Sequence, residues 1–377
     1  MSSKQVSLSS AICHSLGILA LSVASVALCG EGAGSTMVAG YQFVSFDAPG
    51  ATGQFTIPHH INNGGVITGG YFDSNFIEHG FIRAKDATYT SFDAPLGVNG
   101  TDPEGINDRG DIVGLYFDGN GALHGFLRDR SGIITSIDAP FAGTQGTVAF
   151  AINPQGIITG WYLDTNGNDQ VFLRSPDGSF TAVFPPDAAF GALSQSINNQ
   201  GVIDGVTQDS SSVFHGFVRQ IDGSIITFDA PGAGTGSEQG TLPALILQGN
   251  THQGLNQRGD ITGETVDSDN TVHGFLRKAD GDFVLFDVPG AGTTNYNGTA
   301  PGSINSSGTI CGTYLDNNGL FHGFVRQRDG SIVPFDAPGA SQTVPIVLND
   351  SGEIAGFWFD TSGNVHGFLM VPHGGQD

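Results

Sequence analysis

Residues 110–140 read GDIVGLYFDGNGALHGFLRDRSGIITSIDAP, and this stretch decides the fold because the chain repeats it. Each copy follows an Ile-Asn or Leu-Asn pair, contains a segment similar to His-Gly-Phe-Leu-Arg, and most close with a segment similar to Phe-Asp-Ala-Pro. The asparagines number the repeat units 1 to 7: Asn62, Asn107, Asn153, Asn198, Asn256, Asn305 and Asn349. Their spacings are 45, 46, 45, 58, 49 and 44 residues. A period of this length indicates a repeat architecture, which can close 377 residues into one body.

Each unit predicts four short strands. In unit 2 the first strand ends at Ile106, and the others are expected at residues 111–118, 122–129 and 133–140. Asn-Gly and Asp-Gly pairs between them permit the positive φ angles of tight hairpins, and the closing proline cannot donate to a ladder. No long amphipathic helix pattern is visible. The chain is therefore expected to be all-β, with four antiparallel strands per unit arranged around a centre as in a β-propeller.

The two ends of the repeat array are complementary. Residues 43–49, FVSFDAP, match a fourth strand without the three strands before it, while unit 7 stops after Leu369 without a fourth strand. Pairing the two completes the last unit and leaves no exposed sheet edge. We predict a seven-bladed propeller of four-stranded antiparallel blades, closed by the N-terminal strand. An open seven-unit solenoid is the alternative, and it would leave both ends unfinished.

The first thirty residues are typical of an export signal. Lys4 provides a basic start, and residues 16–28 form an apolar run too short for a convincing membrane anchor. The expected organisation is a signal peptide at residues 1–30, a short linker at 31–42 and a single propeller domain at 43–377. The protein is expected to be secreted, extracellular or periplasmic, with no transmembrane anchor.

Cysteine usage agrees with a fold that needs no disulfides. Cys13 and Cys29 leave with the signal, and Cys311 then stands alone. Lipoprotein anchoring at Cys29 is not expected, because the bulky Leu28 precedes it where a small residue is required.

The acidity of the chain excludes some partners. A net charge of -23 argues against nucleic acid, whose phosphates need Lys and Arg, and against an anionic membrane surface. Almost all of the acidic residues are aspartates, which favour turns by bonding to their own backbone. Much of this charge is therefore explained by turns.

The repeat also resembles a known family. Its His-Gly-Phe triplets, Ile-Asn-x-x-Gly-x-Ile-x-Gly segments and Phe-Asp-Ala-Pro endings are similar to those of bacterial extracellular HAF-repeat proteins. The resemblance covers essentially the whole mature chain. It implies export and a repeat architecture, and it implies no particular reaction or ligand.

Three residue types recur on the third and fourth strands. The histidines are His79, His124, His215, His273, His322 and His366. One histidine per blade places them too far apart for shared metal coordination, so we expect a structural hydrogen bond in each blade. The arginines are Arg83, Arg128, Arg174, Arg219, Arg277 and Arg326. The aspartates are Asp93, Asp138, Asp229, Asp287 and Asp336, and we expect them to pair with the arginines.

Candidate functional residues are those that depart from the repeat. One group precedes the unit asparagines, where propeller side chains approach the central channel: His59, His60, Glu104, Gln195 and Gln253. A second group lies on and around the long connection before unit 5 and could gather on one rim: Glu238, His252, Glu264, Asp267 and Asp269. Either group could supply metal ligands or an acid/base pair, and solvated loop residues without a role are the plainer interpretation.

Some hairpins resemble the start of a calcium loop. Asp164 and Asn166 lie in one, and Asp267 and Asp269 in another. The bidentate Glu of an EF-hand is missing, because Ser175 holds that place after Asp164. Hairpin turns are the favoured interpretation, and weak calcium binding stays open. No other cofactor is expected.

The function expected from these features is binding. We predict an exported, non-catalytic and monomeric propeller that binds a glycan, a cell-envelope component or a protein on its loop face. The alternative is an extracellular hydrolase or lyase acting on a carbohydrate or a small secreted molecule. No nucleophile elbow, His-Glu-x-x-His, Cys-x-x-Cys or phosphate loop is present. Fold alone does not decide between binding and catalysis.

Overall fold

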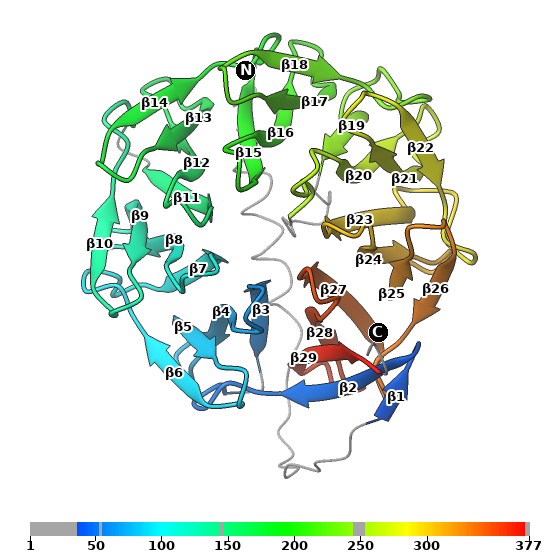
Figure 1. Ribbon diagram of the computed structural model, residues 1–377, viewed down its shortest axis with the longest axis horizontal. Coiled ribbons are helices and arrows are strands. Elements are labelled where there is room, and N and C mark those ends of the chain that lie inside the picture. The colour runs from blue at the N-terminus through cyan, green and yellow to red at the C-terminus, as the bar shows by residue number, and fades with distance from the viewer. Residues whose placement is uncertain (1–35, 53–54, 144–145, 244–252, 374–377) are drawn as a thin grey trace, which may run out of the picture.

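The computed structural model describes residues 36–52, 55–143, 146–243 and 253–373. The predicted signal peptide with Cys29, the first residues of the predicted linker and His252 lie outside these ranges. Every regular element in the described ranges is a β-strand, and the strands stand in groups around a common centre (Figure 1). The prediction of an all-β, propeller-type arrangement is confirmed.

The strands follow one order in every unit, from the centre outwards. The first strands are β3 (Thr56–Ile61), β7 (Thr101–Ile106), β11 (Thr147–Ile152), β15 (Gly191–Ile197), β19 (Gly240–Pro243), β23 (Gly298–Ile304) and β27 (Gln342–Leu348). The second strands are β4 (Ile67–Phe72), β8 (Ile112–Phe117), β12 (Ile158–Leu163), β16 (Ile203–Gln208), β20 (Ile261–Val266), β24 (Ile310–Leu315) and β28 (Ile354–Phe359). The third strands are β5 (Glu78–Arg83), β9 (Leu123–Arg128), β13 (Asp169–Arg174), β17 (Phe214–Arg219), β21 (Val272–Arg277), β25 (Phe321–Arg326) and β29 (Val365–Pro372).

The outer strands are the shortest. They are β6 (Tyr89–Phe92), β10 (Ile134–Ile137), β14 (Phe180–Val183), β18 (Ile225–Phe228), β22 (Phe283–Phe286) and β26 (Ile332–Phe335). The predicted fourth strand at 133–140 was too long, because after Ile137 the chain leaves the ladder and the side chain of Asp138 bonds to His124.

Strand pairing within a unit is antiparallel, and units are joined more loosely. Single parallel residue pairs, such as Asp169 with Gly191, connect units 3 to 6 into one 16-stranded sheet. Units 1 and 2 form separate four-stranded sheets. In unit 7 the outer place is taken by β2 (Tyr41–Phe46), which pairs antiparallel with β29, and β1 (Thr36–Val38) pairs with β2. The N-terminal strand therefore meets the last unit as predicted.

The unit asparagines form a ring of hydrogen bonds around the centre. The Oδ1 of Asn62 accepts the N–H groups of Gly64 and Val66, which fixes the turn after the first strand. Its Nδ2 donates to the carbonyl oxygen of Asn107 in the next unit. The same bond recurs from each asparagine to the next, and Asn349 donates back to Asn62. The Ile-Asn motif therefore links neighbouring units through buried amides.

The first strands carry a bulge that explains one repeated glycine. In the six units whose first strand is described throughout, the register shifts by one residue, as between Pro58 and His60. The carbonyl before the bulge then presses against the glycine of the second strand: Gly69, Gly114, Gly160, Gly205, Gly312 and Gly356. A Cβ there would collide with that carbonyl. A bulge changes the direction in which a side chain points. In these first strands the bulge residue is the third from the end of the strand, which is His59 in β3.

The repeated histidines bond to aspartates, whereas most of the repeated arginines stack on phenylalanine rings of the preceding unit. In six units the histidine Nδ1 lies about 3 Å from the fourth-strand aspartate, as in His124 with Asp138 at 2.8 Å, so the structural hydrogen bond is confirmed. The expected Arg–Asp pairing was wrong. Arg128 instead stacks its guanidinium 5.0 Å from the ring centre of Phe92 in the preceding unit. An aromatic face attracts a cation, and this contact joins adjacent units.

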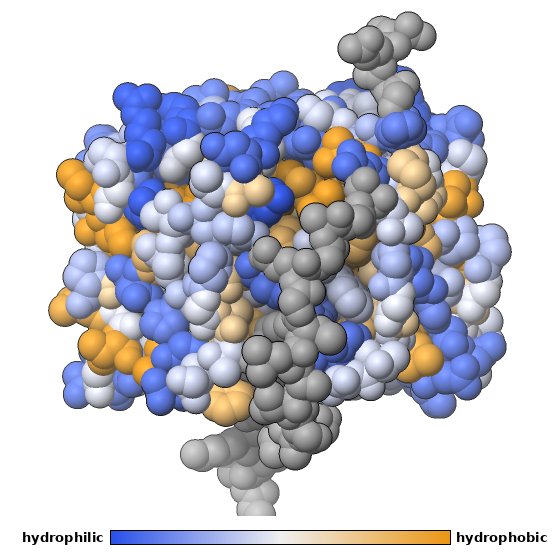
Figure 2. Space-filling model, turned by 90° about the horizontal axis from the view of Figure 1, so that it is seen from below, coloured by the Kyte–Doolittle hydropathy of each residue, from blue (hydrophilic) through white to orange (hydrophobic). Residues whose placement is uncertain are grey.

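The interior is built from apolar clusters between units. One of them runs without interruption through units 2 to 5, from Leu123 to Val272. Cys311 is free and buried in another. No helix of the described ranges is long and apolar enough to cross a membrane. In the edge view of Figure 2, apolar residues occur in small groups separated by hydrophilic ones.

Candidate functional site

The clearest departure from the repeat lies between units 1 and 2. Asp102 occupies the second position of β7, where the other units have Ile57, Val148, Leu193, Leu242, Ala300 and Val344. Glu78 begins β5, where five other units have Leu123, Phe214, Val272, Phe321 and Val365. Gly70 replaces a larger residue in β4. The apolar layer that continues through units 2 to 5 is therefore replaced by two carboxylates between units 1 and 2, although buried acids also occur elsewhere, at Asp169 and Glu264.

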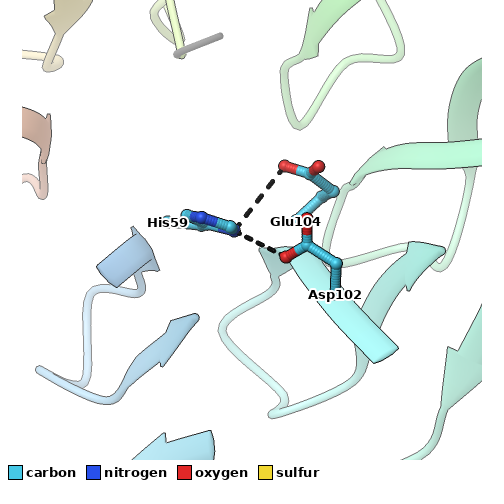
Figure 3. Close-up of side chains that lie close together, drawn as sticks. All are labelled: His59, Asp102 and Glu104. Atoms are coloured by element: carbon cyan, nitrogen blue, oxygen red, sulfur yellow. Dashed lines mark ion pairs between the residues drawn. The ribbon is translucent and has the colours of Figure 1, made fainter. Parts of the chain in front are cut away.

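Two bulge residues complete the group. His59 of β3 and Glu104 of β7 each stand at the shift in register of their strand. The His59 Nδ1 lies 3.1 Å from Asp102 Oδ1, 3.9 Å from Glu104 Oε2 and 2.9 Å from the carbonyl oxygen of Pro103. Figure 3 shows the imidazole of unit 1 pointing at both carboxylates of unit 2. Neighbouring units thus supply opposite halves of the cluster.

Glu78 lies close enough to this group for its charge to act on His59. Its carboxylate sits over the backbone of Gly70, and a side chain at that position would collide with it. Its Cβ is also next to Gly100, which precedes β7. The glycine in β4 therefore makes room for this glutamate, at a position that is apolar in five of the other units and is Asp169 in unit 3.

The electrostatics follow from burial of several carboxylates around one imidazole. Burial disfavours the charged form of His59, but Asp102, Glu104 and Glu78 outweigh it and raise the pKa of His59 to about 10. Burial, with the charge of Asp102, raises the pKa of Glu104 to about 8 against the opposing effect of His59. Burial and the same carboxylates raise the pKa of Glu78 well above its ordinary value.

The remaining channel residues line the same cavity as His59 and Glu104. His60 Nε2 is 3.2 Å from Gln253 Oε1, and burial lowers the pKa of His60 to about 4. Gln195 is 3% exposed and joins them in the cavity wall with His59 and Glu104. The five residues that the sequence placed near the channel are therefore brought together.

The cavity is small. Its volume is about 20 Å³, and roughly 10–15 Å³ on this measure holds one water. The adjoining space inside the asparagine ring has a volume of about 60 Å³. A water molecule or a single ion fits beside His59, and a sugar ring does not.

The rim group does not form one exposed cluster. Glu264 is 2% exposed within β20, opposite Leu242, whereas Glu238 is exposed in the connection before β19. Asp267 and Asp269 lie in the hairpin after β20, and His252 is outside the described residues. The predicted rim site is not assembled by the residues that the structure describes.

The hairpin aspartates act as turn acceptors. Oδ1 of Asp164 accepts the N–H groups of Asn166 and Asn168, and Oδ1 of Asp267 accepts those of Asp269 and Thr271. This geometry agrees with the hairpin interpretation. Calcium binding by these hairpins stays a prediction.

Two members of the buried cluster, Asp102 and Glu78, were missed from the sequence. Both lie inside strands, where alternation makes a polar residue look like an outward-facing one. A column-by-column comparison of the units would have revealed them, because the other units have mostly apolar residues at both positions.

Large apolar side chains are exposed in the hairpins and connections of units 1 and 2. Phe76 is 77% exposed in the hairpin between β4 and β5, and Leu96 is 63% exposed in the connection to β7. Val98 in the same connection, Phe117 at the end of β8 and Phe141 in the connection to β11 are exposed as well. Antiparallel alternation places these hairpins and connections on one face of the molecule, which we term the loop face. The five residues Phe76, Leu96, Val98, Phe117 and Phe141 are termed the apolar patch.

Comparison with known proteins supports the architecture. No family model and no curated protein matches the chain. A solved streptogramin B lyase is 12% identical, with a TM-score of 0.54, over 88% of this chain and 98% of that one. Virginiamycin B lyase from Staphylococcus aureus is 13% identical, with a TM-score of 0.54, over 88% and 99%. A lectin from Burkholderia pseudomallei is 12% identical, with a TM-score of 0.50, over 90% and 98%. At these identities the likeness shows a propeller-type fold alone.

Proposed function

We propose that the protein is an exported, seven-bladed β-propeller of the HAF-repeat type that binds a protein partner through its loop face. The closed ring of asparagine hydrogen bonds and the pairing of β2 with β29 support seven blades and closure by the N-terminal strand. The apolar N-terminal run supports export.

Phe76 is the observation that carries the proposal. Its backbone has φ of 58°, a left-handed conformation that is a rare outlier for a bulky residue. At the same hairpin position the other units have residues suited to that conformation: Gly121, Gly167, Ser212, Asn270, Gly319 and Gly363. An exposed phenylalanine held there stabilises neither the hairpin nor the core. Strained residues of this kind are concentrated at functional sites.

Leu96 and Phe141 also depart from the repeat, although their own φ angles are not positive. They follow the closing Ala-Pro, where Gly50, Gly232, Gly290 and Gly339 stand in other connections. An exposed large apolar residue thus stands in place of glycine in the connections on both sides of unit 2, which adds apolar area to the loop face. Such surfaces mark interaction sites in soluble proteins.

The chemistry of the apolar patch favours a polypeptide over a sugar. Leu96 and Val98 offer branched aliphatic surface, which packs against apolar side chains of a partner. Phenylalanines supply large anchors for the same kind of contact. A glycan or another envelope component remains the competing ligand and is separated by the test below.

Extracellular hydrolysis or elimination is the second candidate. The observation in its favour is the convergence of His59, Asp102 and Glu104, of which His59 and Glu104 line the channel cavity. The small volume of that cavity is the observation against it, because an organic substrate would not reach the carboxylates.

The test uses Phe76→Gly, alone and combined with Leu96→Ser and Phe141→Ser. Phe76→Gly relieves the backbone conformation, so thermal stability should be kept or increased while partner binding is lost. Immobilised wild-type and variant proteins are compared for partners from envelope and secreted fractions, for binding to a glycan array, and for turnover of polysaccharides. Ile221→Ser is the matched control, because Ile221 is 73% exposed in a turn on the opposite face.

The outcomes separate the hypotheses. A directly binding protein retained by wild type and Ile221→Ser, and lost with the triple variant, supports the proposal. If the wild type binds a glycan and the triple variant does not, the ligand of the loop face is a glycan and not a protein. If the triple variant still binds the ligand, the proposal of a loop-face site is wrong. Turnover that is abolished by Glu104→Gln would favour the enzyme hypothesis.

A further inference from the structure

We propose that His59, Asp102 and Glu104 form a binding site for one divalent transition-metal ion, Zn²⁺ or Mn²⁺, between units 1 and 2. His59 and Glu104 line the channel cavity, and the site does not depend on the loop-face function. Among the described residues, these three form the one group of His, Cys, Asp or Glu whose ligand atoms all lie within 4.8 Å of one another.

The distances already match those of ligands around an ion. With bonds of about 2.1 Å, two ligand atoms of the same ion lie roughly 3.0–4.2 Å apart. The His59 Nδ1 lies 3.1 Å from Asp102 Oδ1 and 3.9 Å from Glu104 Oε2. Only small side-chain rotations are needed to coordinate an ion, because the strands hold all three ligands in place (Figure 3).

More acceptors surround the imidazole nitrogen than one proton can satisfy. Oxygens of Pro103, Asp102 and Glu104 all approach the Nδ1 of His59. One N–H forms one linear hydrogen bond, and no other hydrogen-bond donor reaches Asp102 Oδ1 from the described residues. A cation in place of the proton is attracted by all three oxygens and by the nitrogen.

A second observation points into the same cavity. Gln195 is 3% exposed and lines the cavity with His59 and Glu104. Its Oε1 is buried and has no hydrogen-bond partner within the described part of the chain. A buried amide oxygen without a donor is costly, and it needs water or an ion. A water completing the coordination of the metal would bond to it.

Glu78 serves as an outer partner. It has no ligand atom in the group, but its carboxylate lies close enough to influence His59 and Glu104. Residues behind the ligands orient them and adjust their charge. The space made by Gly70 for Glu78 is then part of the site.

The donor set selects the class of metal. Imidazole nitrogen with carboxylate oxygens suits Zn²⁺ and Mn²⁺. Calcium takes six to eight oxygen ligands, which this small cavity does not offer. Magnesium demands near-ideal octahedral oxygen geometry and retains several waters. Neither is expected to compete well.

Metal titration tests the site directly. The full chain, prepared without a histidine tag and treated with a chelator, is titrated with Zn²⁺ and Mn²⁺ by calorimetry, with Mg²⁺ and Ca²⁺ as comparison ions. One transition-metal ion per chain is expected. Asp102→Asn and Glu104→Gln should weaken binding by more than about 100-fold, and Glu78→Gln by about 10–100-fold.

Asp138→Asn provides the matched control. Asp138 also pairs with a histidine, His124, at 2.8 Å, but on the exposed outer part of unit 2. Binding should be unchanged in this variant. Equal binding in wild type and Asp102→Asn, or a loss of binding in Asp138→Asn of the same size, would overturn the proposal.

A measurement on the wild type does not depend on whether the variants fold. Crystals soaked with Zn²⁺ or Mn²⁺ should give an anomalous-scattering peak within bonding distance of His59, Asp102 and Glu104. A peak elsewhere, or no peak there at saturating metal, contradicts the site.

Discussion

At the scale of single residues, one position of the first strand holds an apolar core residue in most units and a buried carboxylate, Asp102, in unit 2. The column that holds Asp102 is apolar in the other units because it packs against the preceding unit. Burying a carboxylate there costs free energy unless other groups compensate. Units 1 and 2 place these charges together with His59 and Gly70, so we interpret the cluster as a functional feature that lowers stability.

Reverting the cluster to the repeat should therefore stabilise the metal-free protein. The double variant Glu78→Leu with Asp102→Val restores residue types found in other units, and we expect a free energy of unfolding higher by roughly 1–4 kcal/mol. Urea denaturation in the presence of a chelator measures it. Transition-metal binding should be lost at the same time. A less stable metal-free variant would show that the carboxylates support the fold instead.

Asp204 is a second buried acid, and it has a different consequence. Burial raises its pKa from 3.8 to about 7, although the backbone N–H of Ser196 donates to its Oδ1. The folded state thus holds a proton that the unfolded state has released between about pH 4 and pH 7. The free energy of unfolding must fall as pH rises through this window, by roughly 4 kcal/mol in all.

The variant Asp204→Asn should lack this step. Urea denaturation at intervals from pH 4.5 to pH 8.5 gives the free energy of unfolding of both proteins. Wild type should lose stability relative to Asp204→Asn as the pH rises, with most of the difference present by pH 8. Parallel pH profiles would mean that Asp204 keeps an ordinary pKa in the folded protein.

The sequence predicted some of these residue roles and missed others for a physical reason. His59 and Glu104 were found because the position before the unit asparagine faces the channel in every unit. Asp102 and Glu78 were missed because their burial comes from the neighbouring unit, which lies about 45 residues away in the chain. The histidine bond was predicted, but its partner was not, because Arg128 finds the ring of Phe92 across a unit boundary.

At the scale of elements, each turn is also a joint between units. Asn153 shows this double role: its Oδ1 accepts the N–H groups of Gln155 and Ile157, and its Nδ2 donates to the carbonyl of Asn198. The Asn-x-x-Gly signal predicted the turn. The bond to the next unit could not be predicted, because it depends on how the units are packed.

Asn153→Ala should destabilise the protein by about 2–4 kcal/mol, because it leaves buried backbone groups without partners. Differential scanning calorimetry measures the effect as a lower Tm. Asn166→Ala is the matched control, since Asn166 is exposed in a hairpin and only its backbone N–H bonds to Asp164. Equal decreases of Tm in the two variants would show that the asparagine ring contributes no particular stability.

At the scale of the whole molecule, the two ends of the repeat array are joined. β2 pairs with β29 along its whole length, and Phe43 stacks on Phe368 with ring centres 5.3 Å apart. His366 bonds to Asp47 as the other histidines bond within their own units. Arg83 of unit 1 lies over the ring of Phe46. The N-terminal strand thus contacts the last unit and the first, and it connects them.

Removing that strand should open the molecule. A chain lacking residues 1–49 exposes the edge of β29 and uncovers Phe368 and Met370, which are 0% exposed in the intact protein. Loss of three buried aromatic side chains, Tyr41, Phe43 and Phe46, should cost at least about 5 kcal/mol. The free strand edge should pair with another chain. Light scattering is expected to show dimers or larger species, with a lower Tm.

A chain lacking only residues 1–35 is the control and should stay monomeric. A peptide of residues 36–52, added to the chain that lacks residues 1–49, should restore the monomer. A monomeric, equally stable chain without residues 1–49 would show that β2 is not needed for closure.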